Sequence, residues 1–350
     1  MYYLLVIALL LSLVSAHAEM KRTASGKPDL TGTYDTGTLT PLERPKEFGN
    51  NKFMTREDAE KVVADAEAFL AFANRETSGD REAPPKGGDG NNRAGAGNVG
   101  GYNAFWVDRG DDVFEIDGKF RTSIIYAPEN GRRPPMTREA MASTAARFQS
   151  FAHDNDGTAS WLAHAGPGPF DGPESLAPSE RCLISFGSTV PTLPSLYNNY
   201  KRIVQTDEYV MILQEMVHDA RIIRMNAEHS PEGNRKWMGD SVGRWEGDVL
   251  VVETRNFKGA SSLAGADKDL HVVERYSLMP DGNVLYDFTV NNPTVWTAPW
   301  SGEYVWRSSP NKVYEYACHE GNYAMGNVLR GARLLESEWE GEIATDAGEE

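Results

Sequence analysis

The chain has 350 residues, of which 51 are acidic and 35 are basic, so its net charge at pH 7 is −16. A surface this acidic repels the phosphates of nucleic acids and the headgroups of anionic lipids, and neither is expected as a partner. The length is enough for one large domain or two small ones.

The first 18 residues have the pattern of a secretory signal peptide. Residues 4–14 are apolar except for Ser12, and an A-x-A cleavage site follows at residues 16–18. The mature protein is therefore expected to be secreted or periplasmic, with no attachment to the membrane after cleavage.

Residues 19–180 are predicted to form a first strand at 29–34, then helices and Gly/Pro-rich loops that wrap the rest of the protein. Helices are predicted to start after Thr55 and Thr137, because each threonine precedes acidic residues that suit a first helical turn. Thr55 and Asp58 also have the spacing of a capping box.

Residues 181–336 are predicted to form an antiparallel β meander with a closing helix at Asn322–Glu336, and residues 337–350 an acidic tail. Short runs rich in β-branched and aromatic residues alternate with turns, and strands joined by short turns are antiparallel neighbours. The predicted strands are Ile203–Val204, Tyr209–Met216, Val217–Met225, Val249–Thr254, His271–Leu278, Val284–Val290 and Val313–Cys318. The expected fold is mainly β with flanking helices, an α+β arrangement whose meander closes as a lipocalin-like barrel of the calycin type. A β-sandwich is the alternative.

The chain has only two cysteines, Cys182 and Cys318. Export would place them in an oxidising compartment, so a disulfide between them is predicted. A reactive thiol at one of them is the alternative.

Residues 239–243 spell G-x-S-x-G, the pattern of a hydrolase nucleophile elbow around Ser241. An elbow needs a strand before the serine and a helix after it, whereas a hairpin is predicted to follow Ser241. The order Ser241, Asp267 or Asp269, His271 matches that of α/β-hydrolases and keeps a nucleophilic serine as an alternative.

Residues 237–248, W-M-G-D-S-V-G-R-W-E-G-D, followed by L-V-V-E-T at 250–254, resemble the signature of a family of secreted bacterial proteins whose activity is uncharacterised. Further similar stretches lie at residues 203–206, 270–276 and 314–322. The resemblance covers the C-terminal half and the P-D-L-T-G-T opening at 28–33. It implies export, and it carries no activity or site residue over to this chain.

Ionisable side chains interrupt two apolar strands. Alternation places His218 and Arg224 on one face of their strand and Arg221 on the other, and it places Glu274 on the face opposite His271. A histidine that shares a barrel cavity with a carboxylate could transfer protons near neutral pH. The structural alternative is an ion-pair ladder with the neighbouring Glu215 or Glu274.

The candidate catalytic residues are His218, Glu274, Asp240, His271 and His319. Arginines could hold an oxyanion or carboxylate by two parallel hydrogen bonds, and aromatic side chains could form a cavity wall or its rim. The candidate substrate-binding residues are Arg221, Arg224, Arg244, Trp237, Tyr316 and Trp300. Ordinary packing is the alternative for the aromatic residues, although Trp296 and Trp300 lie in a loop-like stretch that favours a rim.

No cofactor is expected. The G-x-G-x-x-G run at residues 95–100 has no strand before it and no helix after it, and no metal-binding spacing of His or Cys is present. The expected function is a secreted or periplasmic acid–base enzyme, an isomerase, lyase or hydrolase, acting on a small apolar or aromatic molecule in the barrel cavity. A barrel that binds or carries such a ligand without changing it is the alternative.

Overall fold

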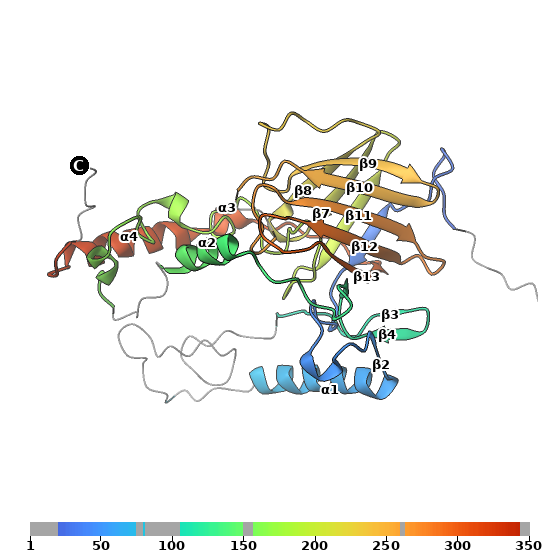
Figure 1. Cartoon of the computed structure of the whole chain (residues 1–350), viewed down its shortest axis with the longest axis horizontal. Coiled ribbons are helices and arrows are strands. Elements are labelled where there is room, and N and C mark those ends of the chain that lie inside the picture. Colours follow the sequence, from blue (N-terminus) through green and yellow to red (C-terminus); the bar gives the residue numbers. More distant parts are fainter. Residues whose placement is uncertain (1–19, 75–79, 81–105, 150–156, 260–262, 344–350) are drawn as a thin grey trace, which may run out of the picture.

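The computed structural model describes residues 20–74, 80, 106–149, 157–259 and 263–343. The predicted signal peptide and the run at residues 95–100 lie outside the described residues. The central feature is a nine-stranded barrel, which is closed because β1 pairs with both β6 and β13 (Figure 1). The barrel strands are β1 (Gly32–Asp35), β6 (Tyr200–Gln205), β7 (Tyr209–Gln214), β8 (Ala220–Met225), β9 (Asp240–Glu246), β10 (Val249–Arg255), β11 (His271–Leu278), β12 (Val284–Asn291) and β13 (Trp300–Ser309). The prediction of a mainly β fold with a barrel and flanking helices is confirmed.

One pair of neighbouring strands corrects the predicted antiparallel meander. Strands β8 and β9 are parallel, so the chain must return along the barrel between them. This crossover, residues 226–239, lies against the outer wall, where the Asn256 amide donates to the carbonyl of Ser230 and the backbone N–H of Lys236 donates to the carbonyl of Asn256. The crossover covers one strip of the outer wall and creates a site there.

The barrel interior is filled largely by aromatic side chains. Buried at 3% exposure or less are Tyr34, Tyr276, Tyr286, Phe288, Trp300, Tyr304 and Trp306. Their rings contact one another, with centroids 4.9 Å apart for Tyr286 and Trp306 and 5.5 Å apart for Tyr276 and Trp306. Aromatic side chains bury large apolar areas and make specific ring contacts, so this cluster stabilises the barrel.

One end of the barrel is closed by a stretch that we call the plug segment, residues 188–199. The backbone N–H of Thr192 donates to the hydroxyl of Tyr286 (2.9 Å), and the hydroxyl of Tyr304 donates to the carbonyl of Thr192 (3.1 Å). Ser188, Val190 and Thr192 are fully buried. The plug segment therefore enters the barrel at the end where β6 begins and β7 ends.

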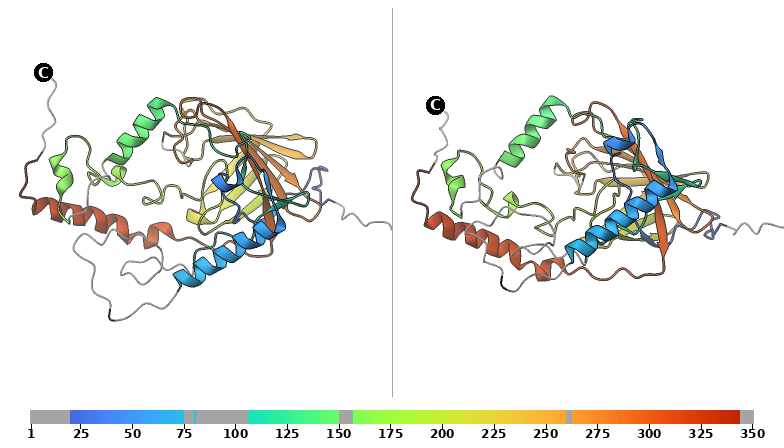
Figure 2. Two further views of the ribbon diagram at one scale, coloured as in Figure 1. Left: turned by 60° about the horizontal axis from the view of Figure 1, so that its bottom comes forward. Right: turned by 90° about the horizontal axis from the view of Figure 1, so that it is seen from below.

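The other elements flank the barrel. Strand β5 (Ile125–Ala127) pairs with β13, and β2 (Phe53–Met54), β4 (Lys119–Arg121) and β3 (Glu115–Ile116) form a small sheet beside α1 (Arg56–Ala73). Helices α2 (Arg138–Gln149) and α4 (Tyr323–Ser337) extend from the plugged end, on opposite sides (Figure 2). The short helices are η1 (Lys46–Phe48), η2 (Ser160–Ala163), η3 (Pro173–Ser175), η4 (Met216–His218) and α3 (Cys318–Gly321). Among the described residues, no helix combines the length and apolar character that crossing a membrane requires.

Several local predictions are confirmed. Thr55 and Asp58 form the expected capping box at the start of α1. Helix α4 lies where the closing helix was predicted. Cys182 and Cys318 form a disulfide, with their Cα atoms 5.8 Å apart.

Two predicted strands differ from the structure. The strand expected at Val217–Met225 starts only at Ala220, because residues 216–218 form η4 and Val217 has a φ of 60°, which no strand residue adopts. The stretch expected at Val313–Cys318 has no regular structure up to residue 317, and Cys318 begins α3. His319 therefore lies in an exposed helical turn and does not end a strand.

Candidate active site

The predicted site residues separate into groups instead of forming one site. Arg221, Glu274 and Trp300 are buried in the barrel, whereas Asp240, Arg224, Arg244 and His271 belong to its outer wall. Trp237 lies in the crossover, 4.6 Å beneath the ammonium of Lys258, and Tyr316 packs beside the disulfide. The side chain of His218 lies outside the described residues.

Trp296 and Trp300 do not form a rim. Their side chains are 3% and 1% exposed and pack edge-to-face, with centroids 5.8 Å apart. Both belong to the main hydrophobic core. Trp300 is the first residue of β13, and its side chain points into the barrel.

Inside the barrel, Arg221 and Glu274 form an ion pair, which is the structural alternative given for these residues. The guanidinium donates to both carboxylate oxygens, at 3.2 and 2.6 Å, and the hydroxyls of Tyr276 and Tyr286 donate to the same carboxylate at 3.0 and 2.7 Å. Burial alone would lower the pKa of Arg221, but the negative charge of Glu274 raises it. Glu274 is thus saturated with donors, which favours a structural role for this pair.

On the outer wall, Asp240 organises a second set of polar groups. Its carboxylate is 1% exposed and accepts hydrogen bonds from the backbone N–H of Ser230 (2.9 Å), the hydroxyl of Ser230 (3.1 Å) and the guanidinium of Arg224 (2.9 Å). The ammonium of Lys236 lies 3.3 Å from it. Burial opposes ionisation, yet the hydrogen bonds from Ser230, His229 and Lys236 lower the pKa of Asp240 to about 2. Asp240 is therefore an anion at any physiological pH.

His229, in the crossover, is held by this anion. Its Nδ1 lies 3.2 Å from the Asp240 carboxylate, and its side chain is 6% exposed. An ionised carboxylate only accepts hydrogen bonds, so Nδ1 of His229 donates its proton to Asp240. Within the described part of the chain Nε2 has no hydrogen-bond partner; its nearest acid is Glu253, 3.8 Å away.

Glu253 links His229 to a second histidine. Its carboxylate lies 3.0 Å from Nε2 of His271, on the neighbouring strand β11. Burial alone would raise the pKa of Glu253, but the hydrogen bond and charge of His271, with the charge of His229, lower it. Asp240, His229, Glu253 and His271 thus form a continuous chain of alternating acids and imidazoles, which we call the outer-wall cluster.

Two clefts flank the outer-wall cluster. One, of about 480 Å³, is lined by His229, Glu253 and Arg244, and the other, of about 470 Å³, is lined by His271, Arg235 and Lys268. Arg255 lines both clefts. Arg244, Arg235 and Lys268 are paired with neighbouring acids, so Arg255 is the cation that could hold a carboxylate or another oxyanion beside the imidazoles.

Sequence reasoning identified Asp240, His271, Arg224 and Arg244 but missed His229 and Glu253. His229 lies in a loop of Ser, Pro, Glu and Gly that predicts an ordinary turn. His229 contacts Asp240 because the chain crosses back along the barrel between the parallel strands β8 and β9. Neither strand alternation nor turn composition reveals the direction in which a strand runs.

Ser241 does not form a nucleophile elbow. It lies within β9, which continues into a hairpin with β10, and its hydroxyl is 2.9 Å from that of Thr254. The side chain is 3% exposed inside the barrel. The serine therefore packs in the wall between two strands.

No protein-family model matches the chain, and no curated protein matches it either. The resemblance to secreted bacterial proteins accordingly stays a prediction. Among the described residues, no group of three or more His, Cys, Asp and Glu has the arrangement of a metal site. A functional proposal therefore rests on the geometry of the outer-wall cluster.

Proposed function

We propose that this protein is a secreted or periplasmic acid–base enzyme of the isomerase, lyase or hydrolase type, needing no cofactor, with His229 as its general base. The observation that supports this proposal is the geometry of His229. One ring nitrogen is fixed by an ionised aspartate, and the other is unpartnered beside a cleft. A base with its orienting acid is the arrangement that general-base catalysis requires.

Each member of the outer-wall cluster has a part in this chemistry. Nε2 of His229 takes a proton from the substrate, and the negative charge of Asp240 stabilises the imidazolium that forms. Glu253, 3.8 Å from Nε2, adds to that stabilisation. His271 is 36% exposed and bonded to Glu253, so it connects the cluster to the solvent.

The lining of the clefts indicates the substrate class. Arg235, Arg255 and Lys268 line one cleft together with Glu232 and Asp269, and Arg244 and Arg255 line the other together with Glu228 and Glu253. Arg235, Lys268 and Arg244 already form ion pairs with neighbouring acids, whereas Arg255 has no ion pair with a described residue. A small molecule that carries a carboxylate or similar anion would be oriented by Arg255, which lines both clefts, with its acidic C–H or O–H toward His229. The sequence-based expectation of an apolar substrate in the barrel cavity fits these polar clefts poorly.

A direct test compares wild-type protein with His229→Gln. Each is incubated with a metabolite extract in deuterated water, and mass spectrometry follows consumption and deuterium uptake of small carboxylic acids. We expect at least one compound to react with the wild type and its rate to fall by about 100-fold or more in His229→Gln, the range for loss of a general base. His164→Gln is the matched control, because His164 is exposed and does not belong to the cluster.

Two outcomes would contradict the proposal. One is turnover by His229→Gln at the wild-type rate. The other is a wild-type protein that changes no compound of the extract.

Binding of a small apolar or aromatic molecule inside the barrel, without conversion, is the second candidate function. The rings of the interior would offer such a molecule aromatic contacts, but they pack against one another, so binding would require them to move apart. The disulfide fits an oxidising compartment and so agrees with export for either function.

A further inference from the structure

The cleft of about 480 Å³ beside His229 contains two opposite charges that are not paired with each other. Arg255 and Glu228 both line it, and both residues are exposed. Within the described ranges of the chain, no residue forms an ion pair or a side-chain hydrogen bond with either of them. A volume of this size lies in the range of small-molecule sites, so a bound molecule has room between the two charges.

The wall and the crossover each supply one of these charges. Arg255 is the last residue of β10, and Glu228 immediately precedes His229 in the crossover. Asn226 also lines the cleft, and its backbone N–H donates to the carbonyl of Gly243 (2.7 Å), which fixes the start of the crossover on β9. The proposed base therefore lies in the same cleft as both charges.

The other ionisable groups that line this cleft already have partners. Arg244 forms an ion pair with Glu246, and Glu253 is bonded at 3.0 Å to the second histidine of the outer-wall cluster. Burial opposes the ionisation of Glu253, and Arg255 is among the charges that lower its pKa, so the two lie near each other without forming an ion pair. Arg255 and Glu228 are thus the charges that remain available to a ligand.

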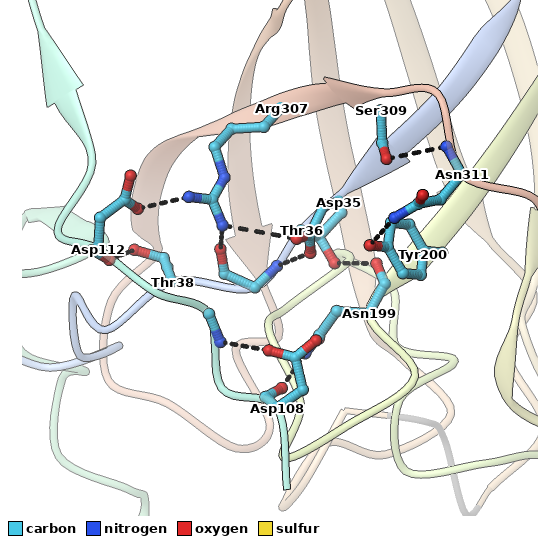
Figure 3. A network of polar contacts seen from close by, with 12 residues as sticks. Asp35, Thr36, Thr38, Asp108, Asp112, Asn199, Tyr200, Arg307, Ser309 and Asn311 are labelled. Atoms are coloured by element: carbon cyan, nitrogen blue, oxygen red, sulfur yellow. Dashed lines mark hydrogen bonds and ion pairs between the residues drawn. The ribbon is translucent and has the colours of Figure 1, made fainter. Parts of the chain in front are cut away.

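Opposite charges are arranged differently at the plugged end of the barrel. There Arg307 forms ion pairs with Asp112 (2.8 Å) and with Asp35 (3.5 Å), and the backbone N–H of Gly37 also donates to the Asp35 carboxylate (Figure 3). Those groups satisfy one another. In the outer cleft the opposite charges stay apart, so both can contact a ligand.

A ligand with both charges fits this cleft better than a ligand with one. A carboxylate can accept two parallel hydrogen bonds from the guanidinium of Arg255, and an ammonium can donate to the carboxylate of Glu228. A simple anion would be repelled by Glu228 and Glu253, and a simple cation would be repelled by Arg255. The cleft therefore favours a small zwitterion, and an amino acid is a zwitterion of this kind.

We propose that this cleft binds a free α-amino acid, with its carboxylate on Arg255, its ammonium on Glu228 and its Cα–H toward Nε2 of His229. The inference rests on the proposed function and names the substrate class of the same site. The two charged groups of the ligand are attached to the same carbon. Contacts on both sides of that carbon therefore position the proton that His229 removes.

The first experiment tests binding and not turnover. Saturation-transfer NMR screens the wild type against the standard amino acids and the dipeptide dialanine at millimolar concentration. Calorimetry then compares the amino acid that binds most tightly with the carboxylic acid that lacks its amino group and with the amine that lacks its carboxylate. We expect the amino acid to bind at least about tenfold more tightly than either analogue, the discrimination that one charged contact of modest strength provides.

Two variants separate the contributions of the charges. Arg255→Gln should lose the preference for the amino acid over the amine, and Glu228→Gln should lose the preference over the carboxylic acid. Arg330→Gln is the control for the arginine, because Arg330 is exposed on α4. Glu232→Gln is the control for the glutamate, because Glu232 is exposed and lines the other cleft. Both controls should keep both preferences.

A further measurement on the wild type needs no variant. Hydrogen exchange with and without the amino acid should show new protection in residues 226–229 and at the end of β10. Protection confined to residues 268–271 of the other cleft would contradict the proposal. So would the absence of binding by any standard amino acid, equal affinity for the amino acid and its two analogues, or tighter binding of dialanine than of every amino acid.

The outcomes distinguish this inference from the acid–base proposal. His229→Gln should bind the amino acid as the wild type does, because the imidazole makes neither of the charged contacts. Binding of an amino acid without any turnover would contradict the acid–base proposal alone. Turnover of a carboxylic acid by a protein that binds no amino acid would contradict the present inference alone.

Discussion

Asp240 combines burial with full ionisation because its donors come from three directions. Ser230 and His229 reach it from the first part of the crossover, Lys236 from the last part of the crossover and Arg224 from β8. Each donor favours the charged form, and together they outweigh the cost of removing the carboxylate from water. Asp240 also fixes the position of the His229 ring. The stability of this part of the wall and the proposed general base therefore both depend on the Asp240 side chain.

The stability of the protein should depend on this carboxylate above about pH 4. The pKa of Asp240 falls from its ordinary 3.8 to about 2 on folding, so its ionised form stabilises the folded state by about 2 kcal/mol. That contribution is complete above the unfolded value and is lost as the pH falls toward 2. We expect the free energy of unfolding of Asp240→Asn to lie below that of the wild type at neutral pH, with the gap narrowing in acid.

Urea unfolding followed by circular dichroism, repeated from neutral pH down to about pH 3, measures this gap. Asp269→Asn is a suitable control, because Asp269 is exposed and has no such set of donors. A gap that stayed constant over the acid range would show that the carboxylate acts through its shape and not its charge.

At the scale of elements, alternation predicted which side chains share a face, and it placed Arg221 and Glu274 opposite Arg224 and His271 as observed. It did not predict which face is inside, nor the direction in which β9 runs. A strand has the same alternation in either direction, so the parallel pairing of β8 with β9 leaves no mark in the sequence. For this reason most of the barrel could be predicted, whereas the contact between His229 and Asp240 could not.

The disulfide connects two parts of the chain that otherwise share little apolar contact. Cys182 precedes the plug segment and Cys318 starts α3. Among the described residues, the apolar cluster around the disulfide is small: Met216 and Val217 are buried with Cys182, and Tyr197 and Tyr316 pack partly buried against them. Residues 311–317 between β13 and α3 have no regular structure. The covalent link, more than packing, therefore holds α3 and α4 to the barrel.

Replacing both Cys182 and Cys318 with serine should release this arm before the barrel unfolds. The expected loss in free energy of unfolding is about 2–5 kcal/mol, typical of a native disulfide. Limited proteolysis with mass spectrometry should find the earliest new cleavage at residues 311–317, with hydrogen-exchange protection of the barrel strands retained. The reduced wild type should behave in the same way; a first cleavage within the barrel strands would contradict this account.

At the scale of the whole molecule, the barrel serves as a rigid wall with polar groups on both sides. The interior places Lys201 and Arg221 among aromatic rings, and the exterior holds the outer-wall cluster under the crossover. Strands buried on one face and partly covered on the other keep both sets of side chains in fixed positions.

The net charge of −16 affects the stability of the whole fold. Excess negative charges repel one another in the compact state, and salt screens them, since the Debye length shortens from about 30 Å at 0.01 M to about 8 Å at 0.15 M. Surface ion pairs weaken over the same range, but each contributes only about 0–1 kcal/mol.

We expect the Tm to rise by a few degrees when sodium chloride is raised from 0.01 M to 0.15 M at pH 7, measured by calorimetry. Near pH 5.0, the isoelectric point of the sequence, the rise should vanish because the net charge does. A Tm that falls with salt at pH 7 would mean that attraction within surface ion pairs outweighs the repulsion between the excess acidic side chains.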